Sequence, residues 1–120
     1  MGFLGKFFGK KAPEVPAPSE HAVLVHFRLG QTDLSPVFAL EDQLEQAIAR
    51  ARAGEFDGNE VATDGSDGTL YMYGPNADKL FEAIRPILER SPIMQGATVR
   101  LRYGPPKEGV RETKVTIGSD

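Results

Sequence analysis

The fold is decided by residues 21–51, which read HAVLVHFRLGQTDLSPVFALEDQLEQAIARA. Residues 21–29 alternate in hydropathy, which is typical of a strand with one buried face, and Gly30 ends the strand. The side expected to face inward comprises Val23, Val25, Phe27 and Leu29, and the outward side comprises Ala22, Leu24, His26 and Arg28.

The second half of this stretch predicts an amphipathic helix. Ser35 is expected to cap it, with Pro36 at the first helical position, and Gly54 is expected to stop it. Acidic residues come early and arginines late, as the helix dipole favours. The apolar stripe expected to be buried comprises Val37, Leu40, Leu44, Ala47, Ile48 and Ala51.

A hairpin and a second helix follow. A short strand is expected at 60–63, turn residues at 64–68 and an alternating strand at 69–73. Asn76 is the expected cap of the second helix, whose stripe comprises Ala77, Leu80, Phe81, Ile84, Ile87 and Leu88. Pro86 lies on its outward side, and the helix is expected either to kink there or to end near Arg85.

Two further strands complete the pattern, at 97–103 and 111–117, separated by the loop 104–109. The order β-α-β-β-α-β-β predicts an α+β fold, a ferredoxin-like two-layer sandwich. Its sheet is expected to be rich in antiparallel pairs, to carry both helices on one face and to gain the last strand at one edge. The core-facing strand residues are expected to be Val23, Val25, Phe27, Leu70, Met72, Val99 and Leu101.

The other face of such a sheet is left open, and six side chains are expected to share it. We call them the open-face patch: His26, Arg28, Tyr71, Tyr73, Arg100 and Arg102. A protein partner or a small anionic ligand would fit this patch, and a second copy of the chain is a further candidate. Aromatic rings beside guanidinium groups also resemble a sheet that binds RNA, but the body is acidic and the aromatic consensus of that class is absent, so nucleic acid is disfavoured.

No residue pattern indicates catalysis, a metal or a cofactor. Five acidic residues crowd one short stretch: Glu55, Asp57, Glu60, Asp64 and Asp67. They lack the spacing of a calcium loop, and tight turns explain the Asp-Gly pairs. The serines lack an elbow motif, and His21 and His26 would face opposite sides of the sheet. A small enzyme that acts on an anionic molecule at the open face stays an alternative to a non-catalytic binding module.

The sequence before the domain divides into two segments. Residues 1–11 form a basic, aromatic tail, residues 12–19 a proline-rich linker, and the domain is expected to span 20–120. The tail could contact a membrane surface or a partner through apolar and basic residues: Phe3, Leu4, Lys6, Phe7, Phe8, Lys10 and Lys11. The tail carries a charge of +3. The net charge of the whole chain is −3, so the other 109 residues together carry −6.

The composition narrows the class of protein. With 120 residues the chain holds one domain, and 40% hydrophobic and 26% charged residues are typical of a globular protein. The absence of cysteine excludes disulfides and thiolate sites and fits a reducing compartment. We therefore expect a cytoplasmic protein that could lie peripherally on the inner face of the membrane.

Three segments carry a resemblance. They are DGNE at 57–60, DGSDGTLYMYGPNAD at 64–78 and RLRYGPP at 100–106. Over residues 37–118 the chain resembles a group of small bacterial proteins with no assigned function. The resemblance implies a bacterial, cytosolic origin and an α+β fold, and it implies no activity and no site residues.

Overall fold

The computed structural model describes residues 20–118, which form five strands, two α-helices and one short 3₁₀ helix. The elements in chain order are β1 His21–Arg28, α1 Ser35–Ala51, β2 Glu55–Val61, β3 Asp67–Gly74, α2 Ala77–Arg90, η1 Pro92–Met94, β4 Thr98–Arg102 and β5 Glu112–Thr116. The expected order of strands and helices is confirmed, and η1 is an addition that the sequence pattern did not predict.

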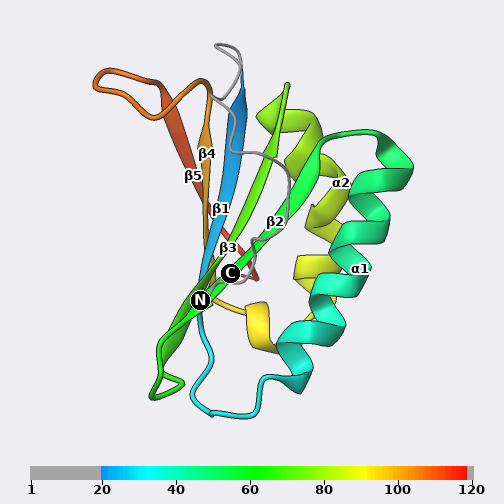
Figure 1. Ribbon diagram of the computed structural model, residues 1–120, viewed down its shortest axis with the longest axis vertical. Helices are drawn as coiled ribbons and strands as arrows, with labels where there is room; N and C mark the ends of the chain where they lie inside the picture. The colour runs from blue at the N-terminus through cyan, green and yellow to red at the C-terminus, as the bar shows by residue number, and fades with distance from the viewer. Residues whose placement is uncertain (1–19, 119–120) are drawn as a thin grey trace.

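The strands form one sheet in the order β2-β3-β1-β4-β5, and every neighbouring pair is antiparallel. Figure 1 shows both helices packed on the same side of this sheet, so among residues 20–118 no helix covers its other side. The α+β, two-layer ferredoxin-like prediction is therefore confirmed, with β5 added outside β4 at one edge.

The core lies between the sheet and the helices. All seven strand residues expected to face the helices are at most 2% exposed. They pack in one hydrophobic cluster with the stripes of α1 and α2, represented by Leu40, Leu44, Leu80 and Ile84. Two members of the expected α1 stripe differ: Ala47 is half-buried and Ala51 is exposed.

The start of α1 differs from the expectation. Ser35 is the first helical residue rather than its cap, and Leu34 occupies the cap position without a side-chain bond. The carboxylate of Asp33, which precedes the helix, caps its first residue. Oδ1 of Asp33 accepts hydrogen bonds from the backbone N–H of Ser35 at 3.0 Å and from the hydroxyl of Ser35 at 2.8 Å. These two bonds lower the pKa of Asp33.

The end of α1 and the start of β2 also differ from the expectation. Arg52 adopts the left-handed conformation, with φ 53°, and ends the helix two residues before Gly54. β2 then begins at Glu55 rather than at Glu60, because residues 55–61 pair with β3 around a register shift between Phe56 and Asn59. Three of the five acidic residues in the crowded stretch, Glu55, Asp57 and Glu60, therefore lie within β2.

α2 is capped as expected and continues through its proline. The side chain of Asn76 accepts a hydrogen bond from the backbone N–H of Lys79 at 3.1 Å. Pro86 is exposed and the helix continues to Arg90. The prediction that this helix ends near Arg85 is therefore wrong. His21 adds a contact that no local pattern predicts: its Nδ1 accepts a hydrogen bond from the backbone N–H of Ala77 at 2.9 Å.

Candidate functional site

The strand register places all six residues of the open-face patch on the side of the sheet away from the helices. Two cross-strand rows lie side by side. In one row Leu24 of β1 stands between Tyr71 and Arg100, and in the other Ala22 stands between Tyr73 and Arg102. His26 and Arg28 continue the same face of β1, because residues two apart on a strand point the same way.

The centre of the patch is apolar. Ala22 and Leu24 are 0% and 9% exposed, yet neither belongs to the core cluster beneath the helices. They lie on the open face, flanked by the tyrosine rings and the long arginine stems of the neighbouring strands. Such stems cover apolar surface while their charged ends stay in water. The alternation in the sequence predicted the direction of these two side chains but not their burial.

Three of the four basic residues of the patch have acceptors close by. The Nε2 atom of His26 lies 2.8 Å from Oδ2 of Asp67, and Nε of Arg100 lies 3.6 Å from Oε1 of Glu112. Arg102 donates from Nε to the carbonyl oxygen of Gly104 at 2.8 Å. Ion pairs this exposed stabilise little, by at most about 1 kcal/mol. Their consequence is that the open face carries both signs of charge.

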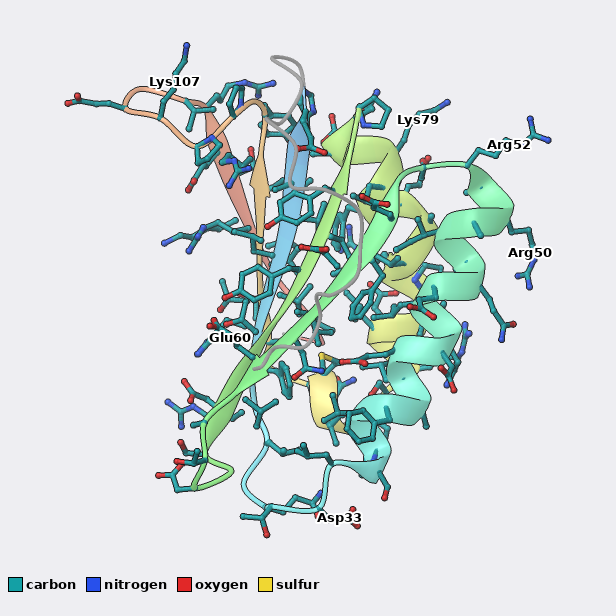
Figure 2. All side chains as sticks on the ribbon, in the orientation of Figure 1. Asp33, Arg50, Arg52, Glu60, Lys79 and Lys107 are labelled. Atoms are coloured by element: carbon teal, nitrogen blue, oxygen red, sulfur yellow. The ribbon has the colours of Figure 1, made fainter. Side chains whose placement is uncertain are left out.

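The pKa values of the two tyrosines of the patch are raised above the usual value. The hydroxyl of Tyr71 donates to Oε1 of Glu60 at 2.5 Å, and burial together with this carboxylate raises the pKa of Tyr71 to about 12. Burial raises the pKa of Tyr73 as well, aided by the charge of Asp57 and opposed by that of Arg102. Figure 2 shows Glu60 on the side of the sheet away from the helices, where it meets Tyr71.

Three acidic residues of the crowded stretch make separate local hydrogen bonds and do not form one cluster. Glu60 accepts from Tyr71 and Asp67 pairs with His26. Oδ1 of Asp64 accepts from the backbone N–H and the hydroxyl of Ser66, at 2.9 and 2.7 Å, and these bonds lower its pKa. Across residues 20–118, no three His, Asp or Glu side chains come together as a metal site would require. The stretch therefore contributes to the hairpin and to the rim of the patch.

A groove on the helical side was not predicted. It lies between the start of α1, the end of α2 and η1, and has a volume of about 270 Å³. Its lining is mainly apolar, with Leu40, Ile87 and Ile93 among the lining residues. Phe38, which is 52% exposed, also belongs to the first turn of α1. Phe38 directly follows the buried Val37 and lies off the buried stripe of α1. The sequence could therefore have identified it as an exposed side chain.

The residues expected to contact a membrane or partner lie outside the part of the chain that the structure describes. They are Phe3, Leu4, Lys6, Phe7, Phe8, Lys10 and Lys11. Within residues 20–118, neither α1 nor α2 has the length and apolar character that crossing a bilayer requires.

Comparison with known proteins gives one structural match. No protein-family model matches the sequence, and no curated protein matches it. Among solved structures, the chain is similar to the structure of Rv0793 from Mycobacterium tuberculosis, with a TM-score of 0.46 and 19% identity. The match covers 76% of this chain and 99% of that chain.

Proposed function

We propose that the protein is a non-catalytic binding module that takes a protein partner on its open-face patch. The observation that carries the proposal is the pair of adjacent rows in which Tyr71 and Tyr73, on one side, and Arg100 and Arg102, on the other, flank the buried Leu24 and Ala22. Tyrosine and arginine around an apolar centre are the residues that contribute most to binding energy at protein interfaces.

The distribution of charge favours a protein partner over a small anionic ligand. His26 and Arg100 each lie beside a carboxylate, so an anion that bound to either one would also meet Asp67 or Glu112. Nucleic acid is disfavoured for the same reason. A protein surface can instead present charges complementary to both signs, which confers specificity and speeds association.

The protonation of Tyr71 supports a recognition role. A tyrosine that removes a proton from a substrate needs a lowered pKa, whereas burial and Glu60 raise the pKa of Tyr71 to about 12. Its phenol therefore stays protonated at neutral pH and donates a hydrogen bond. No arrangement on this face favours the enzyme alternative over the binding module.

Photo-crosslinking in cells would test the proposal. A photoreactive phenylalanine analogue at Tyr73 should form a covalent adduct with a protein, and the same analogue at Phe38 on the helical side is the matched control. Arg102→Glu in the Tyr73-labelled chain should abolish the adduct. Adducts of equal yield from both positions, or an adduct that Arg102→Glu leaves unchanged, would contradict the proposal.

A titration with inorganic phosphate and pyrophosphate separates the ligand alternative. Chemical-shift changes confined to Arg28, Arg100 and Arg102, saturating at low millimolar anion and lost in Arg102→Glu, would assign the patch to an anionic small molecule instead. We expect no saturable change, because the neighbouring carboxylates oppose a bound anion.

We also propose that the module works in the cytoplasm and that residues 1–11 hold it to the inner face of the membrane. The support is the chemistry of this segment, four large apolar residues and three lysines. The full chain should sediment with vesicles that contain phosphatidylserine, and a chain without residues 1–12 should not. Equal sedimentation of the two chains, or none with the full chain, would contradict this attachment.

A further inference from the structure

The two edges of the sheet differ in their capacity to pair with another strand. On β2 the register shift between Phe56 and Asn59 breaks the ladder, and Gly58 adopts a positive φ of 106°. The side chain of Asn59 is also bound to Glu41 of α1. Bulges of this kind protect an edge from pairing. β5, at the other edge, pairs with β4 in unbroken register over all five of its residues.

The backbone of β5 presents a regular set of donors and acceptors on its free side. Tyr103 donates to the carbonyl of Arg111 at 2.9 Å, and Ile117 donates to that of Ala97 at 2.9 Å, so odd-numbered residues of this strand bond toward β4. Backbone groups alternate in direction along an antiparallel strand. Those of Glu112, Lys114 and Thr116 therefore point outward from the sheet.

The side chains on this free edge are complementary to themselves. If two copies of β5 paired antiparallel about Thr113, Glu112 of each copy would stand opposite Lys114 of the other, and both residues are among those whose backbone faces outward. Centring the pair on Lys114 would place two lysines opposite each other, and centring it on Val115 would place Lys114 opposite Thr116. Opposite charges in register stabilise a sheet and like charges destabilise it, so the charges select the pairing about Thr113.

Within one chain, Lys114 stands in an unfavourable electrostatic position. Its cross-strand neighbour on β4 is Arg100, a like charge on the same face of the sheet. The nearby carboxylate of Glu112 is 3.6 Å from Arg100, and both side chains are partly exposed. A second carboxylate on the free side of β5 would balance this excess of positive charge, and the Glu112 of another copy would supply it.

We propose that the free edge of β5 is a self-association surface, on which two copies pair about Thr113 into one continuous ten-stranded antiparallel sheet. The twofold axis runs through the pair of Thr113 residues, perpendicular to the sheet. Both helical layers then lie on one side and both open-face patches on the other, so the pairing leaves the proposed partner site uncovered. The inference is independent of the proposed function.

Charge reversal tests the pairing. Sedimentation equilibrium of the full chain should show a dimer, and Glu112→Lys and Lys114→Glu should each weaken dimerisation about tenfold or more, since each change turns two attractive pairs into two repulsive ones. Mixing the two variants should restore a dimer, because every cross-strand pair in the mixed species joins a lysine to a glutamate. The double reversal Glu112→Lys with Lys114→Glu should also dimerise.

Matched controls carry the same charge changes on α2: Lys79→Glu and Glu82→Lys, both exposed, should leave dimerisation unchanged. Slowed amide hydrogen exchange at Glu112 and Lys114 in the wild type, lost in either single variant, would place the contact at this edge. A wild-type chain that stays monomeric at about 1 mM would overturn the proposal. So would a dimer that persists in both single variants, or a mixture of the two that stays monomeric.

Discussion

Tyr71 binds its proton more tightly in the folded protein than in the unfolded chain. Burial raises its pKa from the usual 10.0 to about 12, and Glu60 contributes as an acceptor and as a negative charge. When the folded state holds a proton that the unfolded state has released, stability falls as pH rises. Tyr71 therefore stabilises the fold fully below pH 10 and loses this contribution between about pH 10 and 12.

Tyr71→Phe should expose this dependence. The variant loses the hydrogen bond to Glu60 and should be less stable than wild type by about 0.5–1.5 kcal/mol at pH 8. The difference should shrink toward pH 12, because only the wild type carries the titrating phenol at this position. Urea denaturation at intervals from pH 8 to 12 would measure it. Parallel stability curves for the two proteins would contradict the assignment.

Glu41 provides a second residue-scale test. Burial raises its pKa, the charges of Glu45 and Asp42 raise it further, and the hydrogen bond from Asn59 opposes them. The folded state therefore favours the protonated form, and ionisation of Glu41 costs stability as pH rises above 4.5. Its partial exposure keeps this cost small.

Glu41→Gln should keep the acceptor for Asn59 and remove the charge. We expect the variant to be more stable than wild type by about 0.5 kcal/mol at pH 7, with the advantage lost below pH 4.5, where Glu41 is protonated in both states. Thermal unfolding at pH 4 and pH 7 would measure both effects. Glu45→Gln, at an exposed position on the same helix, is the control and should change stability less.

At the scale of elements, Gly54 joins α1 to β2 through a close backbone approach. A Cβ at this position would lie 2.0 Å from the carbonyl oxygen of Tyr73, and the φ of Gly54 is +147°. Gly30 also has a positive φ, +76°, but a Cβ there would meet no heavy atom within 4 Å. Substituting each glycine by alanine therefore separates the free-energy cost of a positive φ from the cost of a steric collision.

Gly54→Ala should destabilise the fold by about 3 kcal/mol or more, because β2 must move away from β3. Gly30→Ala should cost about 1–2 kcal/mol, the conformational penalty alone. Urea denaturation of both variants gives the comparison. Equal losses in the two variants would show that the approach between Gly54 and Tyr73 does not constrain the sheet.

Local patterns predicted the elements whose signal lies within a few residues. The two helical stripes and the alternation of β1 and β3 are of this kind, as is the Asn76 cap. The start of β2 was predicted five residues too late, because its first residues are acidic and gain their strand conformation by pairing with Tyr73 and Met72 of β3. The cap of α1 was misassigned to Ser35, because its hydroxyl donates to the Asp33 carboxylate instead of accepting from a backbone N–H in the first turn of the helix.

At the scale of the molecule, the patch could be predicted because the strand order brings its members together. β1 lies between β3 and β4, so the outward residues of three strands share one surface. The burial of Leu24 and the pairing of Tyr71 with Glu60 could not be predicted, since both depend on side chains from different strands meeting at a set register. The occupant of the patch stays a prediction.

The expectation that the domain begins at residue 20 leads to a prediction for the whole chain. Within residues 20–118, every element of the sandwich lies in 21–116 and the core cluster ends at Ile117. A chain of residues 20–120 should therefore unfold cooperatively with the same Tm as the full chain. Differential scanning calorimetry of the two chains would measure this. A Tm lowered by more than about 5 °C would show that residues 1–19 stabilise the domain.

The position of β1 in the middle of the sheet has a consequence for synthesis. β1 needs two partners, and both are synthesised after it: β3 ends at Gly74, and β4 begins at Thr98. Until both have emerged, β1 exposes two unpaired edges and an apolar face, a combination that attracts chaperones and other nascent chains. The helices can form as they emerge, but β1 gains its second partner only after β4 has emerged.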